Sequence, residues 1–374
     1  MTSPANPLLD PPLITPDRLE RLEGAIASLF ETRLDVVLPQ AEAVLPLEAA
    51  ARSLGRSDLT VLNLDTSPYG TTMGRWLQET GASVIGIAPE PHEAVRPEAV
   101  KRTLSEHPDI SVVSFVHVEA ASGVRNDAAA ISGLAHEHGA LIVIDLVASI
   151  GAHEVRLDEW GADIAVIGPQ KALAGPAGIS IAAVSGRAWQ AMADNPGAPR
   201  NSLLSLLDWK ERWLDSDKSA IPGTPAPLEI IALEAAIERV LTEGLQHVQL
   251  RHRASAAASR SGARALGLTP FANDSDAAAV ATTLRAPAGL DARALVERAR
   301  AGSLVAISPG FGKLAGTVLR IDHTGQRARL GVVLEALEAL GSALDGYSQL
   351  HGSIRDALAA AEQAWTAEED GALP

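Results

Sequence analysis

Two residues at the ends of neighbouring apolar runs are of types that could share chemistry. Asp145 closes the run Leu141–Asp145, and Lys171 follows the next apolar run, Ile164–Ile167. A buried carboxylate is costly unless a cation or a proton donor faces it. If both runs are strands of one sheet, the acid and the amine meet at the same edge of that sheet.

A pyridoxal-type cofactor needs such a pair. The lysine forms a Schiff base with the aldehyde, and the acid keeps the pyridine nitrogen protonated so that the ring can accept electrons. The alternative is that Asp145 caps the next segment and that Lys171 lies on the surface. The sequences around both residues, considered below, favour the cofactor.

The segments that must position this pair alternate between short apolar runs and amphipathic stretches. The apolar runs are continuous, which is typical of a parallel sheet covered on both faces. We therefore expect an α/β fold whose chemistry gathers at the carboxyl ends of the strands. Strands are expected at 36–38, 60–64, 83–87, 110–117, 140–144, 164–167 and 180–183, and helices at 18–32, 69–80, 97–106 and 128–138.

The pattern changes after a stretch rich in proline and polar residues at 195–227, and a smaller α+β unit is expected to follow. Its helices are expected at 227–244, 245–267, 330–344 and 353–365, with strands at 280–285 and 318–322 and a frayed acidic end. The expected organisation is an N-terminal arm (1–16), a large cofactor-binding domain (17–240), a small C-terminal domain (241–348) and a C-terminal helix and tail (349–374).

Composition excludes several classes of function. The chain has 374 residues and a formal net charge of -15, and an acidic surface repels nucleic-acid phosphates. It has no cysteine, which excludes disulfides, thiolate metal sites and cysteine nucleophiles, and no metal site is expected. The N-terminus lacks the pattern of a signal peptide and no apolar run could span a membrane, so a cytoplasmic protein without membrane contacts is expected.

The segments around Asp145 and Lys171 resemble class V aminotransferases, which are fold-type I enzymes of the alanine–glyoxylate kind. This resemblance covers roughly residues 35–345. It implies a large domain with a mostly parallel seven-stranded sheet and a smaller C-terminal α+β domain. The segments that carry it are 144–151, 158–163, 168–173, 176–178, 224–225, 243–245, 251–253 and 320–325.

The resemblance also implies roles for individual residues. Lys171 would be the Schiff-base lysine, Asp145 the partner of the ring nitrogen, and Arg320 the arginine that binds the substrate carboxylate. Thr224 matches a threonine that reaches the cofactor from a neighbouring subunit, which implies a homodimer or a dimer of dimers. The other expected cofactor contacts are Ser122, in a loop beside the ring, and Gln170.

The chain departs from the family at the phosphate of the cofactor. Phosphate-binding members carry a turn rich in Gly, Ser and Thr before the first helix of the large domain. Here residues 39–50 contain none of these, and Glu42 would repel a phosphate dianion. The alternative is that Glu42 is an early-helix acid favoured by the helix dipole. The segment resembles a branch of the family that uses free pyridoxamine and pyridoxal as substrates, and Tyr69 matches its active-site tyrosine.

The expected function is therefore exchange of the amino group between free pyridoxamine and pyruvate, giving pyridoxal and L-alanine, in vitamin B6 degradation. We expect no tightly bound cofactor, with pyridoxal held as a substrate through Lys171. The alternatives are an aminotransferase or lyase of the alanine–glyoxylate type that uses pyridoxal 5'-phosphate, and a non-catalytic homologue that binds B6 vitamers. Three departures concern the amino acceptor: Phe311 replaces an arginine, Gly223 replaces an aromatic residue, and the N-terminal Gly-Pro segment of the family is not found.

Overall fold

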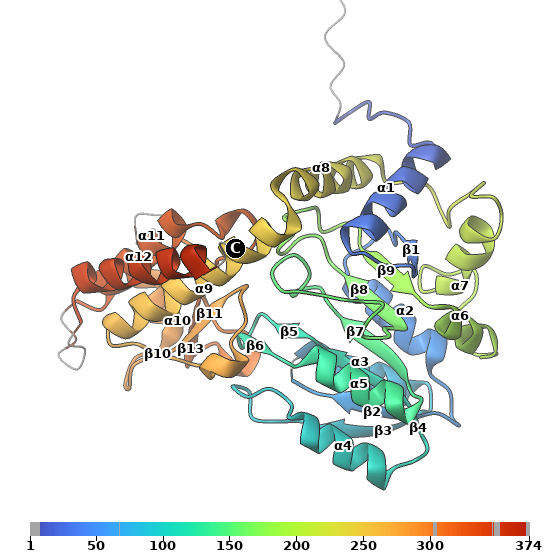
Figure 1. Ribbon diagram of the computed structural model, residues 1–374, viewed down its shortest axis with the longest axis horizontal. Helices are drawn as coiled ribbons and strands as arrows, with labels where there is room; N and C mark the ends of the chain where they lie inside the picture. Colours follow the sequence, from blue (N-terminus) through green and yellow to red (C-terminus); the bar gives the residue numbers. More distant parts are fainter. Residues whose placement is uncertain (1–7, 67, 302–304, 346, 348–351, 372–374) are drawn as a thin grey trace, which may run out of the picture.

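The chain folds into a larger and a smaller part, which lie side by side in a computed structural model (Figure 1). The structure describes residues 8–66, 68–301, 305–345, 347 and 352–371. The main sheet contains β1 (Asp35–Val37), β2 (Thr60–Leu64), β3 (Ser83–Ile87), β4 (Ile110–Val116), β7 (Leu141–Asp145), β8 (Ile164–Ile167) and β9 (Ile181–Val184).

This sheet has the order β1-β9-β8-β7-β4-β2-β3. Strand β9 is antiparallel to both of its neighbours, and the pairings from β8 through to β3 are parallel. The expectation of a mostly parallel seven-stranded sheet is therefore confirmed. Because the parallel strands are buried on both faces, their sequences are continuous apolar runs.

Helices cover this sheet, and several begin or end at residues with a clear local reason. Proline starts α1, α4 and α8, where its missing N–H is not needed. Helix α5 begins at the capping side chain of Asp127, which accepts from the Ala130 N–H, and ends at Gly139 with φ of 84°. The helices are α1 (Pro16–Leu29), α2 (Val44–Leu54), α3 (Pro68–Glu79), α4 (Pro97–Glu106), α5 (Ala128–His138), α6 (Gly186–Ala193), α7 (Leu206–Trp209) and α8 (Pro227–Glu243).

The smaller part has a sheet of four antiparallel strands in the order β10-β11-β13-β12. The sequence predicted β11 and β13 but not the short strands β10 and β12. It also missed α10, and it ended the last helix at Trp365 where α12 continues to Gly371. The elements are α9 (Leu245–Ala265), β10 (Thr269–Pro270), β11 (Thr282–Arg285), α10 (Ala292–Ala299), β12 (Ile307–Pro309), β13 (Val318–Ile321), α11 (Leu330–Ala343) and α12 (Ile354–Gly371), with helical turns at Lys210–Leu214, Asp274–Asp276, Gly312–Leu314 and Gly325–Arg327.

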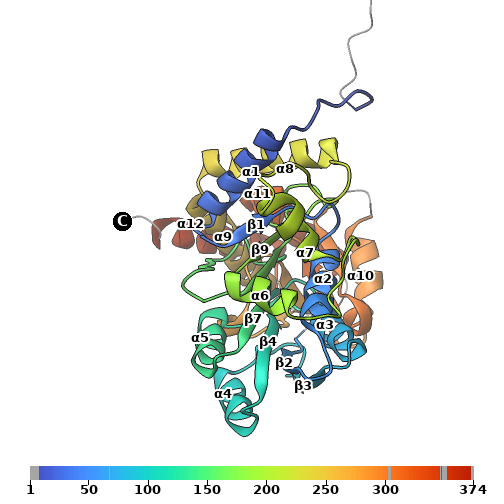
Figure 2. The ribbon, with the colours of Figure 1, turned by 90° about the vertical axis from the view of Figure 1, so that its right-hand side faces the viewer.

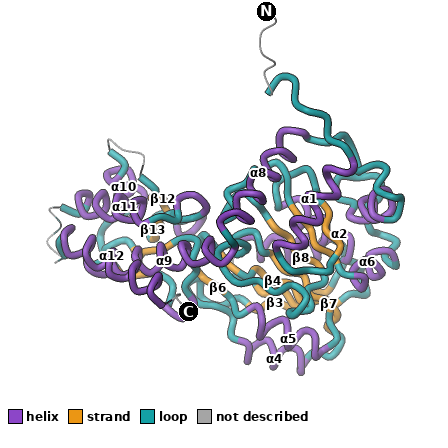
Figure 3. Tube along the Cα trace, turned by 45° about the horizontal axis from the view of Figure 1, so that its top comes forward, coloured by secondary structure: helices purple, strands orange, loops and turns teal. Residues whose placement is uncertain are grey.

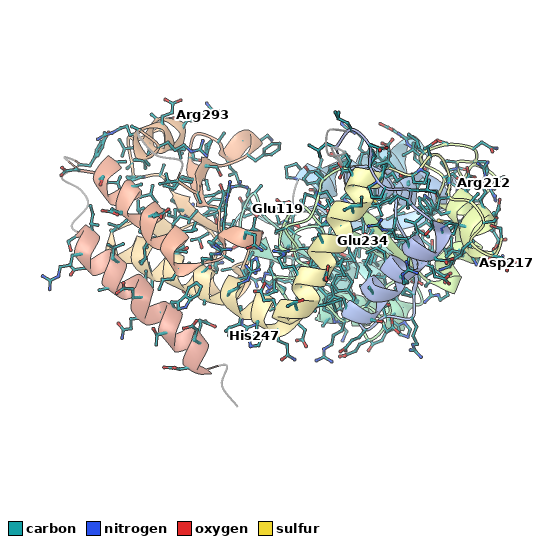
Figure 4. All side chains as sticks on the ribbon, turned by 90° about the horizontal axis from the view of Figure 1, so that it is seen from above. Glu119, Arg212, Asp217, Glu234, His247 and Arg293 are labelled. Carbon is teal, nitrogen blue, oxygen red and sulfur yellow. The ribbon has the colours of Figure 1, made fainter. Side chains whose placement is uncertain are left out.

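One continuous helix, α9, connects the two parts (Figure 3). Val248 near its start belongs to the larger apolar core, and Ala258 further along belongs to the smaller one. In the view from above, α8 and α9 meet near the labelled His247 (Figure 4). The expected domain boundary at 240/241 lies a few residues before this helix and stays a prediction.

Four histidines gather where the two parts meet; His117, His252 and His323 are buried and His153 is partly buried. His153 Nε2 accepts from the Ala279 N–H at 2.9 Å, and His252 Nε2 accepts from the Gly325 N–H at 3.0 Å. His323 Nε2 pairs with a threonine hydroxyl of β11 at 2.8 Å. The ring of His117 lies 5.9 Å from that of His153. We call these four side chains the junction histidines.

The chain before α1 leaves the body of the protein as an arm (Figure 2). The part of the expected arm before residue 8 lies outside the described residues, as do residues 349–351 and 372–374 of the expected tail. Among the residues that are described, no helix has both the length and the apolar character needed to cross a membrane.

Candidate active site

The site forms at the edge of the main sheet where its parallel strands end. Asp145 is the last residue of β7, and Lys171 stands in the turn after β8. Tyr69 is the second residue of α3, the helix that follows β2. Glu119 follows β4 and ends β5 (Val118–Glu119), which pairs with β6 (Val124–Arg125). The fold thus brings together residues from four separate stretches of sequence, as the carboxyl-edge argument predicted.

Asp145 is a buried carboxylate, 7% exposed. Its Oδ1 accepts from the Val147 N–H at 2.8 Å. Burial raises the pKa of Asp145 to about 6, against the opposing effects of the Lys171 ammonium and the Val147 hydrogen bond, while Glu119 and Glu42 add to the rise. A protonated ring nitrogen facing this carboxylate would lower its pKa again and keep it charged.

The turn that carries Lys171 is held by the backbone on both sides. The Gly175 N–H donates to the Pro169 carbonyl at 2.7 Å, and the Ala174 N–H donates to the Lys171 carbonyl at 2.9 Å. On its outer side the turn touches Gly325, where φ is 62° and a Cβ atom would lie 2.7 Å from the Lys171 carbonyl oxygen. The lysine is therefore presented from a fixed turn that packs directly on the smaller part.

Lys171 lines a cavity of about 210 Å³ between the two parts of the molecule. Asp145 lines a smaller adjoining hollow, and Tyr69 contributes to the walls of both. Figure 4 shows Glu119 at the junction between the two parts, facing the space that separates them. The other polar side chains that line the cavity are Arg320, Asp322 and Thr324.

Arg320 reaches the cavity from β13 in the smaller part. Its Nη2 makes an ion pair with Asp322 Oδ1 at 2.9 Å, and its Nε and Nη2 both donate to Ser308 Oγ at 3.1 Å. Its Nη1 donates to the Ala120 carbonyl at 3.2 Å, which ties it to the larger part. Arg320 therefore lines the cavity, with a carboxylate partner that was not predicted, and its role toward the substrate carboxylate stays a prediction.

Glu42 lies at the start of α2 and caps it. Its Oε2 accepts from the Val44 N–H and its Oε1 from Gln170 Nε2, each at 2.8 Å. This geometry agrees with the alternative of an acid near the start of the helix, and it also places Gln170 beside Glu42. The charge of Glu42 contributes to the raised pKa values of Asp145 and Tyr69, so it acts on the site as well as on the helix.

Tyr69 is 44% exposed and stands at the mouth of the site. Burial raises the pKa of its hydroxyl, with further increases from the charges of Glu42, Glu119 and Asp145. Asn63 on β2 fixes the turn beneath it, because its Nδ2 donates to the Gly70 carbonyl at 3.0 Å. The tyrosine therefore stays a neutral, donating phenol among three carboxylates.

Of the five predicted cofactor contacts only Tyr69 lines the cavity within one chain; Glu42 and Gln170, described above, and Ser122 and Thr224 do not. Ser122 is buried, and its carbonyl accepts from Thr283 Oγ1 at 2.7 Å, while its neighbours Ala120 and Ala121 line the cavity. Thr224 is exposed on the loop before α8. That loop is anchored near Glu42, since the Ala226 N–H donates to Gln40. The role of Thr224 in a neighbouring subunit stays a prediction.

Three residues of the site were missed. Glu119 is an acid just after an apolar run, which is the signal that found Asp145. Asp322 stands two residues after Arg320, the spacing that puts side chains on one face of a strand. Asn63 is a polar residue inside the run Thr60–Leu64, and its Oδ1 accepts from Ser114 Oγ at 2.8 Å.

Comparisons with known proteins agree with this arrangement. The aminotransferase class-V family model matches residues 71–299. Pyridoxamine–pyruvate transaminase of Mesorhizobium japonicum is 40% identical over 310 residues, covering 83% of this chain and 78% of that protein. The crystal structure of pyridoxamine–pyruvate aminotransferase from Mesorhizobium loti has a TM-score of 0.90 at 36% identity, covering 96% of this chain and 93% of that one. Ureidoglycine–glyoxylate aminotransferase from Bacillus subtilis has a TM-score of 0.86 at 26% identity, covering 98% and 93%.

These matches correct the expectation about the cofactor. Class V aminotransferases of this fold depend on pyridoxal 5'-phosphate, so the expectation of no tightly bound cofactor is wrong. That expectation depended on Glu42 and on the lack of Gly, Ser and Thr in residues 39–50. Repulsion between one carboxylate and a phosphate does not remove the bond to a lysine or the pairing of the ring nitrogen.

The described residues fit the ring end of such a group. The buried carboxylate of Asp145 suits a protonated pyridine nitrogen, and Lys171 projects from a fixed turn into the adjoining cavity. The family model covers both residues and more than half of the chain. The chain belongs to the class V aminotransferases.

Proposed function

We propose that this aminotransferase moves the amino group of pyridoxamine to pyruvate, giving pyridoxal and L-alanine. The observation that carries the proposal is the single cavity of about 210 Å³ with Lys171 on one wall and Arg320 on the other. Such a cavity can place the amine-bearing carbon of pyridoxamine near the lysine and the carboxylate of a short oxo acid near the arginine. The names of the relatives above support the same pair of substrates.

Each residue of the site has a physical task in this reaction. When bound, the pyridoxal ring supplies an electron sink for the carbon that carries the amine. The Lys171 amine would remove the proton from that carbon as base, and would then deliver it as acid to the carbon of pyruvate that becomes Cα of L-alanine. Asp145 keeps the ring nitrogen protonated, and Arg320 holds the carboxylate of pyruvate or alanine. Tyr69 would stack on the ring or donate a hydrogen bond near it.

We further propose that the protein acts in vitamin B6 breakdown as a homodimer or a dimer of dimers. The resemblance at Thr224 supports this assembly, because this threonine is exposed beside the Glu42 segment in the single chain.

The test is an assay of the purified protein with pyridoxamine and pyruvate. We expect pyridoxal and L-alanine to appear in equal amounts, measured by chromatography. Turnover of L-alanine with glyoxylate, without any use of pyridoxamine, would assign the alanine–glyoxylate activity instead. If neither pair of substrates gives product while pyridoxal binds, the protein is a non-catalytic vitamer-binding homologue.

Glu42 should determine which amino donor is preferred. Glu42→Gln keeps an oxygen that can cap α2 but removes the negative charge, so the ratio of kcat/KM for pyridoxamine 5'-phosphate over pyridoxamine should rise about tenfold. Glu48→Gln on the same helix, where Glu48 pairs with Arg52 at 2.6 Å, is the matched control and should leave the ratio unchanged. An unchanged ratio in Glu42→Gln would show that Glu42 only caps the helix.

A further inference from the structure

The arginine assigned to the substrate carboxylate already has a carboxylate partner. Arg320 and Asp322 are 23% and 15% exposed in their side chains, and their ion pair measures 2.9 Å. Both residues line the cavity that holds Lys171. A substrate carboxylate therefore has to share Arg320 with Asp322 or displace it.

Ser308 forms hydrogen bonds to both members of this ion pair. It stands opposite Arg320 in the register of β12 and β13. Its hydroxyl accepts from Arg320 and donates to Asp322 Oδ2 at 2.5 Å. Since a third nitrogen of Arg320 is used by the Ala120 carbonyl, the guanidinium is held in one orientation before any substrate arrives.

The charges around the cavity are balanced before binding. Lys171 and Arg320 contribute two cations, and Glu119 and Asp322 contribute two carboxylates. Glu119 is 5% exposed, and its Oε1 accepts from the Ala121 N–H at 2.6 Å, so it stays in place. One added carboxylate can pair with Arg320. A second carboxylate in a cavity of this size would be repelled by Glu119 and Asp322 and would have no further cation among the described residues of the cavity wall to pair with.

We propose that Asp322 is a specificity-determining residue, which competes with the substrate carboxylate for Arg320 and excludes dicarboxylic oxo acids. This inference rests on the proposed function, because it assigns the substrate class of the same site to small monocarboxylic oxo acids. Asp322 weakens the binding of every carboxylate, and it weakens that of a dicarboxylate most. The selectivity comes from repulsion inside the site rather than from an added contact.

The first test measures binding without turnover, using the holoenzyme and two unreactive probes. Propionate carries one carboxylate and succinate carries two. In Asp322→Asn, calorimetry should show propionate binding about tenfold tighter and succinate binding where the original protein shows none. Asp322→Glu, which keeps the charge, should still show no binding of succinate. Asp274→Asn removes an acid that pairs with Arg264 at 2.6 Å outside the site, and it is the matched control.

The second test measures turnover in the same variants. Asp322→Asn should lower the KM for pyruvate and give turnover with oxaloacetate, while the KM for pyridoxamine stays the same. Unchanged binding of both probes would overturn the proposal, and so would weaker binding of propionate, because Asp322 would then only orient Arg320. If no variant turns over pyridoxamine but Asp322→Asn binds both probes more tightly, the proposed function fails and the role of Asp322 stands.

Discussion

Replacing Lys171 by alanine should reduce turnover of pyridoxamine and pyruvate by at least about 10³-fold. The lysine is both the group that bonds to the aldehyde and the base that moves the proton, and proton transfer by a positioned side chain alone contributes roughly 10²- to 10⁴-fold. The fold should remain intact, because the turn is held by backbone hydrogen bonds at Ala174 and Gly175 rather than by the lysine side chain.

Single-turnover measurements with Lys171→Ala separate the two roles of the lysine. The variant should bind pyridoxal without the absorbance change that a bond to lysine produces, and an added small amine should restore part of the proton transfer. Lys101→Ala on α4, an exposed lysine far from the site, is the control and should keep full activity. Near-normal turnover in Lys171→Ala would show that another residue carries the chemistry.

Mild acid should unfold the protein, because the junction histidines are neutral in the folded state. Burial lowers the pKa of His117 and His323 to about 3 and that of His252 to about 4, and it holds the pKa of His153 well below its usual value. Two of the rings are locked as neutral acceptors by backbone N–H groups, at Ala279 and Gly325. An added proton at either nitrogen would face another N–H.

The sign of this effect follows from where the protons bind. Below about pH 6.5 the unfolded chain protonates these histidines and the folded protein does not, so stability falls as the pH falls. Each histidine contributes about 1.4 kcal/mol per pH unit between pH 6.5 and its folded pKa. Asp145 acts in the opposite direction because burial raises its pKa to about 6. The loss of stability caused by the histidines below about pH 6.5 is therefore partly offset by Asp145.

Thermal unfolding followed by circular dichroism from pH 7.5 to pH 4.5 checks this expectation. The midpoint should fall steeply below pH 6.5. His252→Gln should be less stable at pH 7.5 and should show a shallower dependence on pH, because one titrating group is removed. His247→Gln, at an exposed histidine on the same helix, should keep the original slope. A midpoint that does not change down to pH 5 would contradict the neutral state of the four rings.

The sequence could predict the main sheet and the Asp145–Lys171 pair for a shared physical reason. Parallel strands buried on both faces must be continuously apolar, so the first charged residue after such a run marks the edge where a site forms. Asp145, at the end of β7, and Lys171, after β8, are the first charged residues to follow such apolar runs. Asp145 and Lys171 lie close together because β7 and β8 are neighbouring parallel strands.

The remaining features of the site depend on contacts that no local pattern encodes. The pairing of Glu42 with Gln170 joins the segments after β1 and β8. The orientation of Arg320 depends on Ser308 in β12, a three-residue strand too short to give a periodic signal. The junction histidines come from four distant segments, and hydrogen bonds between residues far apart in the sequence, such as those of His153 with Ala279 and of His252 with Gly325, fix their positions.

Gly325 makes the smaller part of this protein hard to exchange for that of a relative. Its backbone lies so close to the Lys171 turn that a Cβ atom would meet the lysine carbonyl oxygen at 2.7 Å and Ala174 Cβ at 3.0 Å, and its φ of 62° also favours glycine. Its N–H is bound by His252 of α9 at 3.0 Å. A chimera made by recombination within α9 would therefore have to inherit the glycine, the histidine and the lysine turn together. At this contact, residues of the two parts can be exchanged only as one set.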